Sequence, residues 1–284
     1  MDALRPAVDR LAALDAGAVS RPDAQAWVLL GLRAAGRAEA VPHASRLARF
    51  QLRDGSLPVR ADLPQAHWPT AIAAIAWAGM GGEFAARAED AVGFLCGVSG
   101  KHWESDDLFG HDTSIVGWSW IRDTHSWVEP TSLALLAIDR AGVPGGLQGE
   151  ADGRVDSAVR MILDRQLPDG GWNYGNTVVL GNTLKPLPEE TAFCLCALRG
   201  RAGASDVARS VAYLAGELAH IRSPATLAWT LAALAAWGRV VDAELPVREC
   251  LAVQEAIGAY PPDMLSQLVV AVERPSLILG ETER

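Results

Sequence analysis

Residues 165–172 read Arg-Gln-Leu-Pro-Asp-Gly-Gly-Trp, and residues 50–55 give a shorter copy, Phe-Gln-Leu-Arg-Asp-Gly. In each copy an amphipathic segment leads to a glutamine and an Asp-Gly turn, which glycine permits because it adopts positive φ without steric cost. The glutamine amide can bond carbonyls left free at a helix end while the Trp172 indole packs over it. Two such copies, each placed before an apolar helix, indicate a repeat architecture.

A second repeat is a helix that begins with threonine and continues almost wholly apolar. At three starts the threonine stands close to a proline, where its hydroxyl can cap free N–H groups. A helix that is apolar on all sides must be covered on all sides, so these copies are expected to form an inner layer. They are Thr70 to Trp77, Thr131 to Ile138, Thr191 to Leu198 and Thr226 to Leu234, with a fainter copy from Gln25 to Leu32.

Amphipathic segments between the apolar helices are expected to form an outer layer, giving about five to six hairpins that can close into a ring. These segments are 86–96, 157–166, 207–218 and 247–257. We therefore predict an all-α fold, an α/α toroid, as a single domain over residues 1–284 with repeats from about 22 to 240. Strand alternation and hairpin signals do not recur, so no substantial sheet is expected.

Two long connections interrupt the repeats, at residues 97–129 and 173–190. Each precedes the start of an inner helix, so on a ring both should emerge at the same rim. Loops on a rigid scaffold carry much of protein function. The sequence therefore predicts that any functional site lies at this rim.

The string from Gln166 to Trp172 resembles the QW motif of the terpene cyclase and protein prenyltransferase superfamily, which includes the squalene-hopene cyclases. The first copy departs from it, because Gly55-Ser56-Leu57 lacks the indole, and residues 94–103 are a candidate worn third copy. The resemblance spans Gln25 to Trp237 and implies the toroid fold rather than a reaction. Cyclases that cyclise polyenes are similar to two such barrels with the substrate cavity between them, and this chain has length for one.

Composition narrows the classes of partner. The net charge is −9 with acidic and basic residues interleaved, which argues against a nucleic-acid or anionic-membrane surface. The cysteines are too few and scattered for a disulfide framework and indicate a reducing cytoplasm; they are Cys96, Cys194, Cys196 and Cys250. No secretory signal stands at the start, and the longest apolar stretch, 225–238, is shorter than the roughly 20 residues that span a bilayer. We expect a soluble cytoplasmic protein without a transmembrane segment.

The resemblance suggests where an acid would stand. The cyclase proton donor lies in a D-x-D-D-T-A string, and the matching segment here, residues 187–192, reads Leu-Pro-Glu-Glu-Thr-Ala. Glu189 falls at the position of the proton-donating aspartate, and Glu190 keeps the second carboxylate. Burial and a like-charged neighbour can raise the pKa of such a carboxyl. The alternative is a capping role, since acids in a first helical turn interact well with the macrodipole, and Glu129 before Pro130 is arranged similarly.

The prenyltransferase branch binds zinc through an aspartate, a cysteine and a histidine. The best matching positions here are Glu129, Thr131 and Glu190, so no ligand type is kept. Cys194 and Cys196 point to different helix faces and have no histidine nearby in sequence. We predict no zinc and no other cofactor.

The first long loop combines tryptophans, histidines and acids. Asp106-Asp107 invites comparison with the D-D-x-x-D magnesium motif of isoprenoid diphosphate enzymes, but Gly110 occupies the third position and the next aspartate is Asp112. Ordinary packing and hydrogen bonding are the alternative for its aromatic residues and for the asparagines of the second loop. The candidate catalytic residues are Glu189, Glu190, Asp107 and Asp112, and the candidate substrate-binding residues are His111, Trp118, Trp120, His125, Trp127, Glu129, Trp172 and Tyr174.

Two functional interpretations follow from these patterns. The favoured one is an enzyme of the isomerase, lyase or transferase kind that acts on or binds an isoprenoid or other apolar small molecule, with a rim carboxyl as acid and tryptophans shaping the pocket. The other is a non-catalytic toroid that serves as a scaffold for a lipid, peptide or protein partner. A homodimer or protein partner could also complete a site that one barrel lacks.

Overall fold

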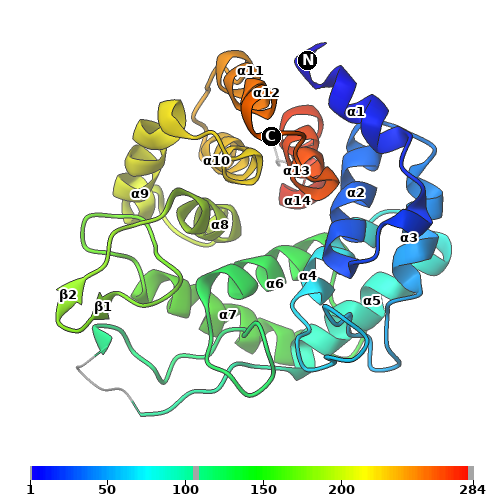
Figure 1. Cartoon of the computed structure of the whole chain (residues 1–284). Helices are drawn as coiled ribbons and strands as arrows, with labels where there is room; N and C mark the ends of the chain where they lie inside the picture. Colours follow the sequence, from blue (N-terminus) through cyan, green and yellow to red (C-terminus); the bar gives the residue numbers. More distant parts are fainter. Residues whose placement is uncertain (1, 105–108, 281–284) are drawn as a thin grey trace.

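The structure, a computed structural model, describes residues 2–104 and 109–280, and most of them lie in helices (Figure 1). The predicted all-α class is confirmed. Within the described residues, the sheet is limited to a two-residue hairpin of β1 (Val178–Val179) and β2 (Asn182–Thr183), which pair in antiparallel register. The same residues contain no helix that combines the length and hydrophobicity needed to cross a membrane.

Six of the described helices pack against one another in a closed sequence of contacts, each against the next and the last against the first. We call them the inner helices, and Figure 1 shows them around a common centre. They are α2 (Pro22–Ala34), α4 (Pro69–Trp77), α6 (Val128–Ala141), α8 (Pro188–Leu198), α10 (Pro224–Ala236) and α13 (Pro262–Glu273).

An outer helix packs against each inner helix on the side away from the centre (Figure 1). The outer helices are α1 (Arg5–Ala12), α3 (Ala40–Ala48), α5 (Gly82–Gly97), α7 (Gln148–Asp164), α9 (Ala204–Glu217) and α11 (Glu244–Ala252). Short helices α12 (Gln254–Ile257) and α14 (Ser276–Leu279) and three 3₁₀ turns, at 2–4, 16–18 and 218–220, complete the described part. In α9 the buried residues recur at helical spacing, at positions 207, 210, 211 and 214, which is the pattern of a helix covered on one face.

The inner helices begin and pack as their sequences predict. Five of them have proline at the first helical position, where its fixed φ suits a helix and its missing N–H costs no bond. In α4 all nine residues are buried. The sequence did not predict α13 as a member of this layer, yet α13 packs between α2 and α10.

In three of the inner helices, α4, α6 and α8, a threonine hydroxyl joins the helix to the turn that precedes it. Each hydroxyl is fully buried and accepts a hydrogen bond from a backbone N–H of that turn. The bonds are Leu57 N–H to Thr70 at 2.9 Å, Trp118 N–H to Thr131 at 3.0 Å and Trp172 N–H to Thr191 at 3.0 Å. These equivalent bonds identify three copies of one structural unit.

The third copy is therefore Gly117-Trp118 rather than residues 94–103, so that expectation was wrong. A Cβ at Gly117 would lie 2.5 Å from Thr131 Oγ1, and a Cβ at Gly171 would lie 2.9 Å from Thr191 Oγ1, so both turns require glycine. The glutamine that marks the motif in sequence is absent from this copy. In the complete copy, Gln166 ties the turn to α9 by donating to Ser210 Oγ at 2.8 Å.

Trp118 and Trp172 are structural residues of these turns. Their indole N–H groups donate to carbonyls near the ends of the preceding outer helices, Leu95 at 2.9 Å and Ile162 at 2.7 Å. Trp118 is 1% exposed and Trp172 is 0% exposed. The sequence analysis counted both among the candidate substrate-binding residues. Because both indoles are buried against outer helices, neither can contact a substrate.

Aromatic side chains fill the space between the inner helices. Trp27 and Trp229 meet edge to face at 5.9 Å between ring centroids, and Phe193 lies 4.3 Å from Trp229. The cavity beside them has a volume of about 10 Å³, close to the minimum for one water molecule. At the ends of the inner helices α14 contacts α4 and α6, and its Leu277 carbonyl accepts a hydrogen bond from Arg140 at 3.1 Å.

The four cysteines are free and buried, as expected for small core residues. Burial raises the pKa of the Cys250 thiol to about 11, which keeps that group protonated at neutral pH.

Candidate functional site

The inner helices begin at one end of the bundle, which we call the rim. Thr226 of α10 bonds Glu189 of α8, and Arg21 at the start of α2 lies 3.7 Å from Asp263 of α13, so neighbouring first turns adjoin. In four inner helices the second residue is acidic: Asp23, Glu129, Glu189 and Asp263. Helix N-termini carry a partial positive charge, which favours acids at this position.

Two of these acids, Asp23 and Asp263, form ion pairs with one arginine, Arg21. Arg21 pairs with Asp23 through both carboxylate oxygens, with Nε donating to Oδ1 at 3.1 Å, and it also reaches Asp263. Asp23 is only 3% exposed, so this ion pair offsets the cost of placing its charge in the protein. The acids of α2 and α13 therefore have a structural role.

The other side of the rim carries Glu129, Glu189 and Glu190, which we call the glutamate group. No ion pair to these three carboxyls is found within the described residues. Burial raises the pKa of Glu129 well above its usual value, and the charges of Glu189 and Glu190 raise it further. Burial also raises the pKa of Glu190. The group therefore holds at least one proton more readily than isolated carboxylates do.

Two side chains from other elements contact or face the glutamate group. The Thr226 hydroxyl donates to Glu189 Oε2 at 2.6 Å. The charge of Glu190, followed by burial and by the charges of Glu129 and Glu189, raises the pKa of the Tyr174 phenol. Tyr174 is thus within electrostatic reach of all three carboxyls.

Tyr174 also lines a cavity of about 440 Å³, which we call the aromatic cavity. Its other lining residues come from the loop before α6 and are Trp120, Ile121, Thr124, His125 and Trp127. The His125 and Trp127 rings lie 4.2 Å apart between centroids, and the Tyr174 carbonyl accepts the Val128 N–H at 3.1 Å. The hydrogen bond between the Val128 N–H and the Tyr174 carbonyl joins the two rim loops next to Glu129 of the glutamate group.

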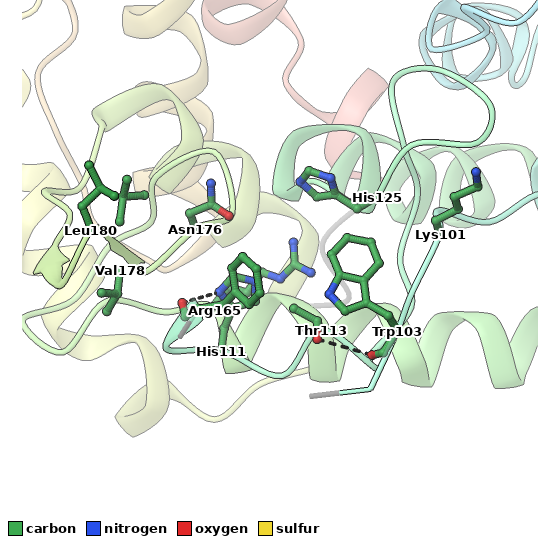
Figure 2. A pocket seen from close by; sticks show the side chains of 11 residues that line it. Lys101, Trp103, His111, Thr113, His125, Arg165, Asn176, Val178 and Leu180 are labelled. Atoms are coloured by element: carbon green, nitrogen blue, oxygen red, sulfur yellow. Dashed lines mark hydrogen bonds between the residues drawn. The ribbon is translucent and has the colours of Figure 1, made fainter. Parts of the chain in front are cut away.

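A second cavity, of about 360 Å³, is drawn in Figure 2 and shares His125 with the aromatic cavity. We call it the arginine cavity after Arg165, the first residue beyond α7. Figure 2 shows Arg165 between His125 and Asn176, with His111 and Trp103 on the same cavity. Two rim loops and the β1–β2 hairpin therefore form its walls.

The structure brings together most of the residues predicted from sequence. Trp120, His125, Trp127 and Tyr174 line the aromatic cavity, His111 and His125 line the arginine cavity, and Glu129 joins Glu189 and Glu190. Asp112 takes a different place: its carboxylate accepts hydrogen bonds from the Ser114 N–H at 2.8 Å and hydroxyl at 2.6 Å, which stabilise a turn beside α7. Asp107 lies outside the described residues.

Sequence reasoning missed Arg165, Lys101, Trp103 and Thr226 as residues of the site. Arg165 directly precedes the glutamine of the turn motif, and the sequence indicated only that motif for it. The sequence marked Thr226 only as the start of an apolar helix, whereas its hydroxyl bonds a carboxylate of the neighbouring helix. The signal for Arg165 was present, because a basic residue at the end of an apolar helical segment needs a partner.

A scan against models of protein families finds no match, and a search of curated proteins finds no relative. The described residues contain no group of three histidine, cysteine, aspartate or glutamate side chains arranged to hold a metal ion.

Proposed function

We propose that the chain is an α/α toroid of the terpene cyclase and protein prenyltransferase type, whose rim binds a small apolar molecule of isoprenoid kind. A carboxyl of the glutamate group acts on this molecule as a general acid. The closed sequence of inner-helix contacts, the outer layer and the three equivalent turns support the toroid. The observation that carries the function is Tyr174, which lines the aromatic cavity and lies within electrostatic reach of all three carboxyls of the glutamate group.

Glu129 is the acid in this proposal. It is the carboxyl whose pKa burial and two like charges raise together, so it holds its proton to higher pH than an isolated carboxyl does. In this proposal Glu189, whose carboxyl is held in place by the hydrogen bond that it accepts from Thr226, receives the proton that the substrate releases. One group that donates and one that accepts are the two parts of general acid–base catalysis.

The aromatic cavity supplies what an apolar substrate needs next to that acid. Trp120 and Trp127 offer apolar surface, and their π faces stabilise a developing positive charge by about 0.5–2 kcal/mol. The filled centre of the helix bundle favours a substrate held at the rim over one enclosed between the inner helices. A compact substrate therefore fits better than a polyene that must fold inside a ring.

A scaffold without catalysis is the second candidate function. Large exposed apolar side chains surround both cavities, and contiguous exposed apolar surface marks sites where lipids, peptides or proteins bind. These side chains are Trp103, Phe109, Ile121, Tyr174, Val179 and Leu180, the last being 95% exposed. A lipid, a peptide, a protein partner or a second copy of the chain would cover them.

Proton transfer to carbon distinguishes the two candidates. The protein is incubated with farnesol, an isoprenoid alcohol, in D2O, where the acid exchanges its proton for deuterium. Donation to a carbon–carbon double bond then forms a carbon–deuterium bond that mass spectrometry detects in the product. We expect Glu129→Gln to lower the rate of this incorporation by about 100-fold or more, the usual contribution of a general acid, and to leave farnesol binding intact.

Asp263→Asn is the matched control. Asp263 occupies the same helical position as Glu129 in another inner helix but faces Arg21, so its loss should leave deuterium incorporation unchanged. Binding of farnesol without incorporation by the unaltered protein would reject the acid and leave the scaffold. If Glu129→Gln and Asp263→Asn lowered the rate of deuterium incorporation equally, the acids at the rim would act only by stabilising the starts of their helices.

A further inference from the structure

Arg165 carries more hydrogen-bonding capacity than its surroundings use. It is 3% exposed, and a guanidinium has five N–H donors. Within the described residues its one recorded acceptor is the Ser126 carbonyl, 2.6 Å from Nη1, and Nε is buried without a partner. A buried charge with unmet donors is costly unless a further acceptor is bound.

The guanidinium lies where a bound molecule can reach it. Figure 2 shows it directed into the arginine cavity between Asn176 and His125. Gly175 lies beside the guanidinium. A Cβ at that position would lie 3.0 Å from Nη1, so the lack of a side chain there leaves room around the charge. Burial lowers the pKa of Arg165 to about 10, and the group still carries its positive charge at neutral pH.

The other polar groups of the cavity are compatible with a single negative charge. His111 Nδ1 lies 2.9 Å from the Phe109 carbonyl, which can only accept, so Nδ1 carries the hydrogen and Nε2 of the neutral ring is an acceptor. Burial, and next the charge of Arg165, lower the pKa of both His111 and His125. Lys101 adds a charge at the exposed edge. One buried cation thus faces the cavity.

We propose that the arginine cavity binds the carboxylate head of an amphiphilic organic acid. A planar guanidinium pairs with a planar carboxylate through two parallel hydrogen bonds, and one buried cation matches one negative charge. His125 borders both cavities, so the apolar body of the same molecule extends over Trp127 into the aromatic cavity and toward the glutamate group. This inference rests on the proposed function and adds the chemical class of its ligand.

Calorimetric titration with decanoate and decanol tests the head group, because the two probes share one alkyl chain. We expect decanoate to bind about 10-fold more tightly or better, the usual effect of hydrogen bonds to charged groups, and Arg165→Gln to abolish the preference. Arg154→Gln is the control. Arg154 is a half-buried arginine that donates to the Val98 carbonyl at 2.7 Å and lies over the Trp118 ring, so its replacement should keep the preference.

A measurement on the unaltered protein covers the case in which Arg165→Gln does not fold. A carboxylate on Arg165 offsets the charge that lowers the pKa of His111 and His125, so saturating decanoate should raise both pKa values in an NMR titration and decanol should not. Equal binding of the two probes, or unmoved histidines at saturation, overturns the carboxylate site. Decanol binding alone then still supports the apolar rim of the proposed function, whereas no binding of either probe rejects both.

Discussion

Replacing Glu129 with glutamine should make the protein more stable at pH 8 and leave its stability unchanged at pH 4. Burial raises the pKa of Glu129 above its ordinary value of 4.5, and the charges of Glu189 and Glu190 add to the effect. Ionising this carboxyl therefore costs more in the folded chain than in the unfolded chain. Glutamine keeps the size and hydrogen-bonding ability of the protonated acid and removes the ionisation.

The sign follows from linkage. Below about pH 4.5 the carboxyl is protonated in both states, so it contributes no difference. As the pH rises toward and through the folded pKa, the unfolded chain ionises first and the unaltered protein loses stability. Each unit by which the pKa is raised corresponds to about 1.4 kcal/mol at the upper end of this range. A gain of 1 kcal/mol shifts the melting temperature of a chain of this size by roughly 2 °C.

Urea unfolding at pH 4, 6 and 8, followed by circular dichroism, measures the effect. The difference between Glu129→Gln and the unaltered protein should grow steadily with pH. Asp263→Asn is the control, because its partner Arg21 is 58% exposed and such a pair contributes about 0–1 kcal/mol. It should lose a little stability near neutral pH. A variant of Glu129 that is no more stable at pH 8 than at pH 4, relative to the unaltered protein, would refute the crowded, desolvated carboxyl.

Two further predictions concern the repeated turns. Thr191→Val keeps the side-chain shape but leaves the buried Trp172 N–H without its acceptor, so guanidinium unfolding should show a loss of about 1–3 kcal/mol, and Thr131→Val should behave alike; unaltered stability in both would disprove the equivalence of the two turns. Trp118→Phe removes the indole N–H that bonds the Leu95 carbonyl and leaves a smaller ring under Arg154, so it should cost stability without weakening decanol binding; a loss of binding at full stability would return Trp118 to the ligand-contacting residues.

The helices could be predicted because their signals are local. A proline, a threonine or acid and an apolar run within a few residues define the starts of α4, α8 and α10. The start of α13 carries Pro262 and Asp263 without the threonine, and Ser266 and Gln267 interrupt its apolar run. Its place between α2 and α10 depends on packing between helices far apart in the sequence, and no local sequence pattern indicates that contact.

The turn at Trp118 was missed for a related reason. The candidate third copy, residues 94–103, lies directly at the end of the preceding outer helix, whereas this copy follows a long loop, and neither segment contains the glutamine. What the three copies share is the threonine acceptor, the close backbone approach and, in two of them, the indole bonded to an outer helix. These are contacts across the fold, so only the structure identifies them.

For the site, the repeats predicted that Glu129 and Glu189 stand at comparable positions. They did not indicate which acids would find a counter-ion. Arg21 serves Asp23 and Asp263, while the described chain provides no such pair for the glutamate group. Likewise, the sequence places Arg165 in a turn motif. Only the structure shows that its guanidinium enters a cavity and that, within the described residues, it has one recorded acceptor.

The contrast among the rim acids separates a structural role from a functional one. Asp23, Glu129, Glu189 and Asp263 occupy the same position in four helices, so the helix macrodipole acts on all four alike. The dipole therefore cannot account for the difference between them, and what differs is the surroundings. On one side an arginine contacts two acids; on the other, three carboxyls lie within electrostatic reach of Tyr174, which lines the aromatic cavity, and burial and like charges raise the pKa of Glu129 and Glu190. Capping requires only the first arrangement, and the second resembles the perturbed groups that cluster at active sites.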